Sequence, residues 1–199
     1  GAKVSDKIGV ITKLLSKASC VLIGGAMANT FIAAKGGELG FSRFEADKVN
    51  IATKILEEAD RKNVKILLPV DVVAAKEFAP NSKKKVVSAY SVPDGYQVLD
   101  IGPKTLKAFK KEIMRANTIV WNGPMGVYEF PRFKVGTMKI AKFIAKSGAT
   151  SVVGGGDSVA AVHESGYANK ISHISTGGGA TLKFLEGANL PGVEMLLDK

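Results

Sequence analysis

The sequence predicts an α/β fold, in which a doubly wound, mostly parallel sheet carries helices on both faces. Short apolar runs rich in Val, Ile and Leu alternate along the chain with longer segments whose apolar residues recur at helical spacing. Because each crossover between parallel strands places a helix against the sheet, strands this apolar are covered on both faces. The 199 residues, of which 46% are hydrophobic, fit one domain spanning residues 1–199 better than two.

The first helix and strand show the alternation most clearly. Val4, Ile8, Ile11 and Leu15 recur at helical spacing, and the apolar run 20–23 predicts the buried strand that follows them. Four further helix–strand pairs repeat this order, which is that of a Rossmann-like, three-layer domain. They are predicted at 44–61 with 65–68, at 104–116 with 118–121, at 133–146 with 150–153, and after Asp157 with 172–175.

The stretch between residues 70 and 102 departs from this order. Turn signals interrupt it at Pro80-Asn81, at Pro93-Asp94-Gly95 and at Gly102-Pro103. We therefore expect a short antiparallel excursion here, inside a sheet that is otherwise parallel.

The composition narrows the class of protein without choosing a ligand. A net charge of +10 suits phosphate ligands, nucleic acids and anionic membranes alike. The densest basic run, 83–85, lies in a turn-like stretch without aromatic residues that could stack on bases, so we expect no nucleic-acid partner. No apolar run approaches the about 20 residues of a membrane span, and the N-terminus lacks a secretory signal. We expect no membrane partner, a cytoplasmic location and a monomer, with the single cysteine, Cys20, unable to form an internal disulfide.

Glycine turns follow the predicted strands, and these turns are where a ligand site is expected. In a doubly wound sheet, ligands bind beyond the carboxyl ends of the strands. The strand at 20–23 runs into Gly24-Gly25, and the strand at 118–121 runs into Asn122-Gly123-Pro124. Each of the last two strands runs into a triple glycine, 154–156 and 177–179, ahead of a predicted helix at 158–162 or 180–185.

The two triple glycines predict places where phosphate groups bind. Glycine lets the backbone approach a ligand closely, and a helix N-terminus offers unpaired N–H groups with a partial positive charge. The alternative is that each is only a tight strand-to-helix turn. Neither stretch is the G-x-x-x-x-G-K-[ST] loop or the G-x-G-x-x-G fingerprint, so the common nucleoside-triphosphatase and dinucleotide motifs are absent.

Three charged residues are candidates for the same site. Asp157, at the start of a predicted helix, fits either an N-terminal cap or a ligand of a nucleotide-bound Mg²⁺. Lys3 and Lys7 lie four residues apart at the first predicted helix and its entry, so both could point at one anion or simply form a solvated face. His163 and His173 form no recognisable ligand pair.

Several motifs resemble phosphoglycerate kinases, in the same order along the chain. They are Gly-Ala-Lys-Val-Ser-Asp-Lys at 1–7, Trp-Asn-Gly-Pro-Met-Gly-Val-Tyr-Glu at 121–129, Gly-Gly-Gly-Asp-Ser at 154–158 and Ser-His-Ile-Ser-Thr-Gly-Gly-Gly-Ala at 172–180, with Leu-Glu-Gly at 185–187 and Leu-Pro-Gly-Val at 190–193. Enzymes of this family are about twice this length. Their N-terminal domain binds 3-phosphoglycerate and their C-terminal domain binds Mg-ADP or Mg-ATP.

The resemblance implies that this chain is the C-terminal, nucleotide-binding half of such a kinase. The whole enzyme transfers a phosphoryl group reversibly between 1,3-bisphosphoglycerate and ADP, giving 3-phosphoglycerate and ATP in glycolysis. Without the N-terminal domain, through which the phosphoglycerates bind, we expect the isolated chain to bind nucleotide but to be nearly inactive. Mg²⁺ with ADP or ATP is the implied cofactor.

The resemblance also assigns roles to individual residues. Lys3 would stabilise the phosphoryl group in flight, with Gly156, Gly178 and Gly179 facing that group. Lys7 would contact phosphates, Glu129 the ribose hydroxyls, and Asp157 the nucleotide's magnesium. Asn122 and Pro124 would line the nucleotide site, and the backbone of Gly155, Gly156 and Ser158 would cradle phosphate. The residues implied around the adenine are Gly24, Gly25, Ala26, Val98 and Leu99.

Two positions depart from the family pattern. Val98 stands where glycine is common beside the adenine, and Ala26 where a third glycine is common. Both add bulk, so we expect weaker adenine binding or a shifted ring. The alternatives are a noncatalytic nucleotide-binding regulatory module, which loss of Lys3, Asp157 or Glu129 would have favoured, and an NAD-binding oxidoreductase domain, which the missing fingerprint disfavours.

Overall fold

The computed structural model describes residues 2–177 and 179–196 of the chain. The α-helices within these ranges are α1 (Ile8–Leu14), α2 (Ala26–Ala34), α3 (Val49–Arg61), α4 (Pro103–Ile113), α5 (Val135–Ser147), α6 (Gly156–Glu164), α7 (Gly179–Glu186) and α8 (Pro191–Glu194). The strands are β1 (Cys20–Leu22), β2 (Lys65–Leu67), β3 (Asp71–Ala75), β4 (Lys84–Ser88), β5 (Gln97–Ile101), β6 (Thr118–Asn122), β7 (Thr150–Gly154) and β8 (His173–Ile174). Short 3-10 helices lie at Ala46–Lys48 and Ala168–Lys170.

The strands confirm the α/β class, with parallel pairs joined by helices. β1 pairs in parallel with β2, and β7 pairs in parallel with both β6 and β8. Between these parallel sheets, β3 lies between β4 and β5 in an antiparallel sheet, which is the excursion expected between residues 70 and 102. The hydrogen bonding therefore divides the strands among three sheets.

The parallel strands carry a hydrophobic core on each face. Successive residues of a strand point to opposite sides, and in β1 and β2 the side chains of Leu22 and Leu67 pack on one side while Val21 and Ile66 pack on the other. The α1–α3 core comprises Val4, Ile11, Leu15, Ile23, Met27, Ala28, Phe31, Ala52, Ile55, Ala59 and Val64. The α4–α6 core comprises Ile101, Phe109, Ile113, Trp121, Met125, Ile140, Ala141, Ile144, Val153, Ala161, Val162 and Ile171.

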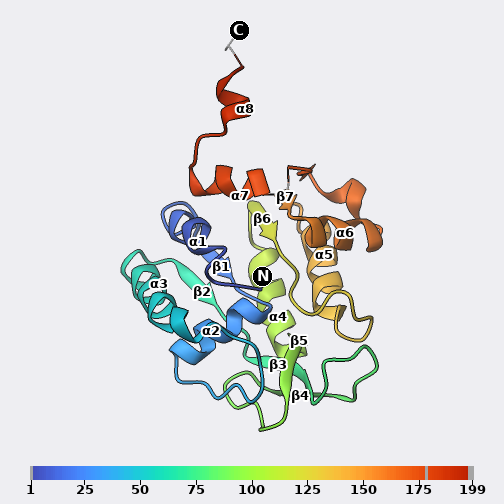
Figure 1. Cartoon of the computed structure of the whole chain (residues 1–199). Helices are drawn as coiled ribbons and strands as arrows, with labels where there is room; N and C mark the ends of the chain where they lie inside the picture. Colours follow the sequence, from blue (N-terminus) through green and yellow to red (C-terminus); the bar gives the residue numbers. More distant parts are fainter. Residues whose placement is uncertain (1, 178, 197–199) are drawn as a thin grey trace.

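Amphipathic helices cover these two faces, as Figure 1 shows, with α1, α2 and α3 on one side of the strands and α4, α5 and α6 on the other. In α4 the buried side chains of Thr105, Phe109 and Ile113 recur every four residues, so one stripe of the helix meets the core. The α4 sequence begins with Pro103, which suits a first helical turn because its missing N–H has no partner there.

The structure differs from the sequence expectation at four elements. The helix expected at 44–61 begins as α3 only at Val49, after the 3-10 helix at Ala46–Lys48. The first helix begins at Ile8 rather than near Val4, because residues 5–7 form a turn. Helix α2 was not expected, because its side chains from Met27 to Ile32 are all buried and leave no helical alternation of apolar and polar residues. The strand predicted at 172–175 is only two residues long, since β8 pairs with β7 only through His173 and Ile174.

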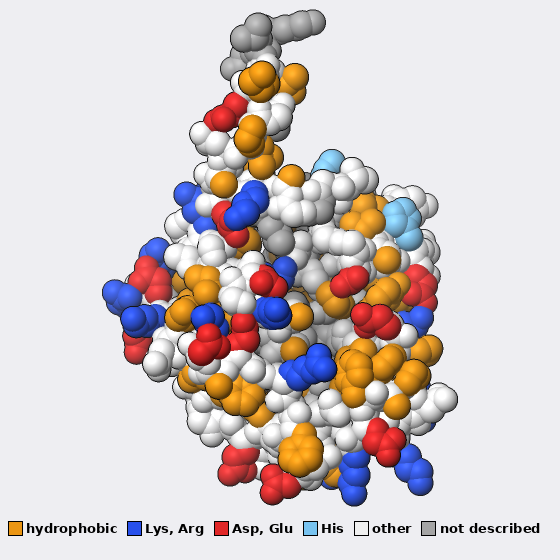
Figure 2. All heavy atoms as spheres, in the orientation of Figure 1, with side chains coloured by type: hydrophobic (Ala, Val, Ile, Leu, Met, Phe, Trp, Pro, Cys, Tyr) orange, Lys and Arg blue, Asp and Glu red, His pale blue; other side chains and the backbone are white. Residues whose placement is uncertain are grey.

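The C-terminal segment extends away from the rest of the molecule. Helix α7 packs against α1, and α8 projects beyond it at the top of Figure 1. Figure 2 shows apolar side chains along this projection, and Phe184, Met195 and Leu196 are exposed. Within residues 2–177 and 179–196, no helix has the length and apolar character that crossing a membrane requires.

Candidate functional site

A cavity of about 730 Å³ opens at the carboxyl ends of β1, β6 and β7 and beside β5. Its volume lies within the range of about 300–1,000 Å³ that is typical of small-molecule sites. Most of the residues predicted from the sequence line it, and they come from both sides of the strands. They are Lys3, Lys7, Gly25, Ala26, Val98, Leu99, Asn122, Pro124, Glu129, Gly155, Gly156, Asp157 and Ser158.

Two glycines with positive φ start the helices that border the cavity. Gly25 precedes α2 with φ 72°, and Gly155 precedes α6 with φ 90°, a region that residues with a Cβ rarely adopt. A Cβ at Gly155 would also lie 2.9 Å from the Asn122 side chain. Neither helix has a side-chain cap, so N–H groups of the first turn of α6 remain available to an anion at the cavity wall.

A chain of hydrogen bonds links Lys7 to the glycine turn at the end of β7. The Lys7 ammonium donates to Oδ1 of Asn122, and Nδ2 of Asn122 donates to the carbonyl of Gly154 at 2.9 Å. Burial lowers the pKa of Lys7 from its ordinary value, and the nearby charge of Asp6 only partly opposes this shift. The ammonium is thus partly desolvated and held at the cavity, where its charge acts strongly on an anionic ligand.

The side chain of Ser158 supports the wall of the cavity from beneath. This side chain is fully buried, and its Oγ accepts a hydrogen bond of 2.6 Å from the N–H of Gly123. Trp121 Nε1 donates to the carbonyl of the same Gly123 at 2.9 Å. These contacts fix the turn after β6 against the start of α6, so the Asn122 side chain is held in place.

The segment from Asn122 to Lys134 carries Glu129 along the cavity. Hydrogen bonds hold this segment to β5 and to the start of α2. The N–H of Val127 donates to the carbonyl of Leu99 in β5, and the N–H of Gly25 donates to the carbonyl of Met125. At its far end, Tyr128 Oη donates to one oxygen of Glu164, and Lys134 donates to the other. The hydrogen bond to Glu164 is the main cause that raises the pKa of Tyr128, to about 12, with burial adding to it.

Asp157 lies in the first turn of α6 with an exposed side chain that borders the cavity. It makes no capping hydrogen bond, and the N-cap position belongs to Gly155, so the capping alternative lacks support. A single carboxylate beside a glycine turn at a helix N-terminus fits a Mg²⁺ ion that arrives with a nucleotide, since such an ion keeps most of its ligands from phosphate and water. In the described part of the chain, no three His, Cys, Asp or Glu side chains gather into a metal cluster.

Two predicted residues of the described part of the chain do not line the cavity. Gly24 is buried behind Gly25, where a Cβ would meet the Met125 sulfur at 2.4 Å. Gly179 is exposed at the start of α7, and Gly178 lies outside the described residues. The second glycine turn is nevertheless adjacent to the first, because a Cβ at Gly154 would contact the Thr181 side chain of α7 at 3.0 Å.

Several cavity residues were not predicted from the sequence. Arg43 and Phe44 come from the loop after α2, and Phe78 comes from the loop after β3, where the Arg43 guanidinium lies 5.6 Å from the Phe78 ring centroid. The available signal in the sequence was that Phe44 and Phe78 each stand beside charged residues, and in the structure both rings are about half exposed. Glu45 and Asp100 also belong to this group, and burial raises the pKa of Asp100 to about 7 against two backbone hydrogen bonds and the charge of Lys84.

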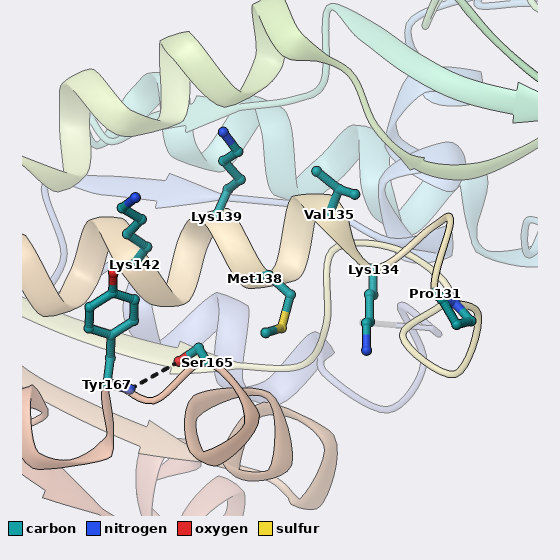
Figure 3. A pocket seen from close by; sticks show the side chains of 8 residues that line it. All are labelled: Pro131, Lys134, Val135, Met138, Lys139, Lys142, Ser165 and Tyr167. Carbon is teal, nitrogen blue, oxygen red and sulfur yellow. Dashed lines mark hydrogen bonds between the residues drawn. The ribbon is translucent and has the colours of Figure 1, made fainter.

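A second hollow, of about 320 Å³, lies between α5 and the turn after α6 (Figure 3). It is lined by Met138, Lys139 and Lys142 of α5 and by Tyr167 from the turn after α6. It contains none of the residues predicted for function, and its Lys134 is already bound to Glu164. The larger cavity therefore remains the candidate site.

Comparisons with known proteins point to one family. A sequence model of the phosphoglycerate kinase family matches residues 1–188. The phosphoglycerate kinases of Koribacter versatilis and Clostridium tetani are 57% and 52% identical to the chain, covering all of it and 50% of their own length. The solved structure of phosphoglycerate kinase from Coxiella burnetii superposes with a TM-score of 0.94 at 42% identity, over 98% of this chain and 50% of that one. The chain spans about half the length of these relatives.

Proposed function

The chain belongs to the phosphoglycerate kinase family, and on that premise we propose that it is the half that binds Mg-ADP and Mg-ATP. The reaction of the whole enzyme would be the reversible transfer of a phosphoryl group between 1,3-bisphosphoglycerate and ADP, giving 3-phosphoglycerate and ATP in glycolysis. One observation supports this proposal above the others. A single cavity is lined by Lys3, Lys7, Glu129, Asp157 and the unpaired first turn of α6.

The nucleotide would lie across the cavity with its phosphates at the N-terminus of α6. Backbone N–H groups there and the Lys7 ammonium supply hydrogen bonds and positive charge to phosphate oxygens. Glu129 would accept hydrogen bonds from the ribose hydroxyls, and the apolar wall of Leu99 and Val98 would contact the base. Magnesium, when bound with the nucleotide, neutralises phosphate charge, and Asp157 would hold it.

Lys3 would act on the phosphoryl group as it moves between the two substrates. Phosphoryl transfer requires positioning and electrostatic stabilisation rather than a covalent bond to the enzyme. Lys3 is exposed at the cavity rim, so its flexible side chain can follow the charge that develops on the transferred group. Phosphoglycerate would have to be presented by the other half, so this chain alone is expected to transfer phosphate negligibly. We further propose that it is a cytoplasmic monomer.

The test is a calorimetric titration of the chain with ADP, with and without Mg²⁺, repeated for Asp157→Ala. Wild type should show saturable binding that Mg²⁺ strengthens by about tenfold, the effect of one good charged contact. The Asp157→Ala variant should lose that gain, whereas Asp94→Ala, which changes an exposed aspartate in the turn before β5, should keep it. Two results with the folded wild-type chain would contradict the proposal. One is that it binds no ADP, and the other is that it binds ADP equally with and without Mg²⁺.

The predicted inactivity has its own assay. The isolated chain is mixed with ATP, Mg²⁺ and 3-phosphoglycerate, and ADP release is followed. We expect no turnover above the rate of ATP hydrolysis in the absence of 3-phosphoglycerate, because nothing closes over the cavity to bring the two substrates together. Turnover that depends on 3-phosphoglycerate would refute this expectation.

A further inference from the structure

The carboxylate of Glu45 binds the segment that carries both cavity lysines. The backbone N–H groups of Val4 and Ser5 both donate to Oε2 of Glu45, the second over 3.2 Å. The Ser5 hydroxyl donates to Oε1 at 2.6 Å. Glu45 lies 40 residues further along the chain than Ser5, so this contact joins two segments that the sequence keeps far apart.

The loop that presents Glu45 is itself fastened to α2. The N–H of Glu45 donates to Thr30 Oγ1 at 3.1 Å, and Nδ2 of Asn29 donates to the carbonyl of Arg43 at 2.9 Å. Asn29 and Thr30 are each only 1% exposed, so this anchorage belongs to the α1–α3 core. The position of the Glu45 carboxylate is thereby tied to a rigid helix.

The segment ahead of α1 needs such a contact. It ends in the turn at residues 5–7, which is closed by a hydrogen bond from the N–H of Lys7 to the carbonyl of Val4, and α1 has no side-chain cap of its own. Val4 is buried in the α1–α3 core, while Lys3 on one side of it and Ser5 on the other are exposed. Val4 alone would fix one point of the segment, and the three hydrogen bonds to Glu45 fix its direction.

We propose that Glu45 is a positioning residue, which holds Lys3 and Lys7 at the phosphate end of the cavity by capping the turn between them. This inference rests on the proposed nucleotide function, because it assigns the lysines to phosphate. The carboxylate does not need to touch the nucleotide. It acts through the backbone of Val4 and Ser5.

The charge of Glu45 distinguishes a positioning role from a purely electrostatic one. Burial raises the pKa of this carboxyl, but the hydrogen bonds from Ser5 and Val4 outweigh burial and lower it below its ordinary value of 4.5. The group is therefore an anion at neutral pH, and it lines the same cavity as the lysines. If it acted only through its charge, its removal would strengthen phosphate binding. A positioning role requires the opposite sign.

The experiment compares ADP with adenosine, which lacks phosphates, in calorimetric titrations of wild type, Glu45→Gln, Glu45→Ala and Ser5→Ala. Glu45→Gln keeps the shape of the side chain but loses its charge and one acceptor. We expect the Kd of ADP to rise about tenfold in both Glu45 variants, the loss of one good charged contact, and less in Ser5→Ala, which removes only the hydroxyl bond. The Kd of adenosine should stay within about twofold, and Glu57→Ala, which changes an exposed glutamate on α3, should change neither ligand.

Equal weakening of ADP and adenosine would show a merely structural role and overturn the proposal, as would tighter binding of ADP by Glu45→Gln. Amide hydrogen exchange at Val4 and Ser5 provides a test that needs no nucleotide. Faster exchange at these two amides in Glu45→Gln, with unchanged exchange in α3, is the expected result, and unchanged exchange at both amides would overturn the cap. Failure of wild type to bind ADP would refute the proposed function alone, because the exchange result would still report on the cap.

Discussion

Replacing Asp100 by Asn measures what it costs to bury a carboxyl group beside the cavity. Asp100 ends the run of β5 residues that line the cavity, and it is only 2% exposed. Its Oδ1 accepts from the N–H of Ile101 at 2.8 Å, and its Oδ2 accepts from the N–H of Gly136, in the first turn of α5, at 2.7 Å. Burial nevertheless dominates and raises its pKa from 3.8 to about 7.

The sign and size of the effect on stability follow from this shift. A carboxyl group whose pKa is raised by folding stabilises the fold while it is protonated, fully below its ordinary pKa and no longer once the pH has risen through the folded value. Between pH 5 and the folded pKa near 7, each pH unit costs about 1.4 kcal/mol. Asp100 therefore removes about 3 kcal/mol from the free energy of unfolding between pH 5 and pH 8.

The assay is urea unfolding at pH 5 and pH 8 for wild type, Asp100→Asn and Asp94→Asn. At pH 5 the Asp100→Asn variant should be about 1 kcal/mol less stable than wild type, because its amide N–H2 now faces the N–H of Gly136 or Ile101 instead of accepting from it. At pH 8, where wild type has lost about 3 kcal/mol, the variant should be about 2 kcal/mol more stable than wild type. The free energy of unfolding of Asp100→Asn should therefore change little between pH 5 and pH 8. That of Asp94→Asn, an exposed control in a turn, should fall by about 3 kcal/mol, as in wild type. A variant with the same pH dependence as wild type would refute the reasoning.

Three further changes test the site and the core. Lys3→Ala, made in the full-length enzyme, should lower kcat by roughly 100-fold with little change in the KM for nucleotide, because about 3 kcal/mol of electrostatic stabilisation acts only on the group in transfer; an equal rise in KM would argue for ground-state binding instead. Val98→Gly should tighten ADP binding and leave pyrophosphate binding unchanged, since it removes bulk only at the base, and unchanged ADP affinity would count against that placement. Phe109→Ala, in the fully buried centre of the α4–α6 core, should cost about 3–5 kcal/mol in urea unfolding, and a loss under 1 kcal/mol would mean that the core collapses into the space.

The sequence was most informative where function depends on neighbouring residues. Strand ends followed by glycine predicted the turn at Gly155, and with it Asp157 and Ser158, because strand, turn and helix N-terminus are all local features. The excursion between residues 70 and 102 was visible for the same reason, since its turns carry Pro and Gly. The sequence did not indicate that the buried Ser158 hydroxyl accepts from the backbone of Gly123, because that contact joins segments 35 residues apart.

The sequence was least informative where tertiary contacts determine which residues are buried and which reach the cavity. Helix α2 is buried all round, so it lacks the alternation that marks a helix at a surface. Glu45 sits in an ordinary polar loop, and only the folded chain brings it to Ser5. Arg43 and Phe78 reach the cavity from different loops, and no spacing rule relates them.

The cavity lies on the joint between the two halves of the molecule, one built on the α1–α3 core and one on the α4–α6 core. Lys7 and Gly25 come from the first half, and their hydrogen bonds to Asn122 and Met125 cross to the second. A ligand that fills the cavity thus cross-links the halves, and at 100 times its Kd it adds about 2.7 kcal/mol against any opening that separates them. Occupancy should therefore slow hydrogen exchange in β2, a strand that does not line the cavity but packs on both cores, through Ile66 on the α1–α3 core and Leu67 on the α4–α6 core.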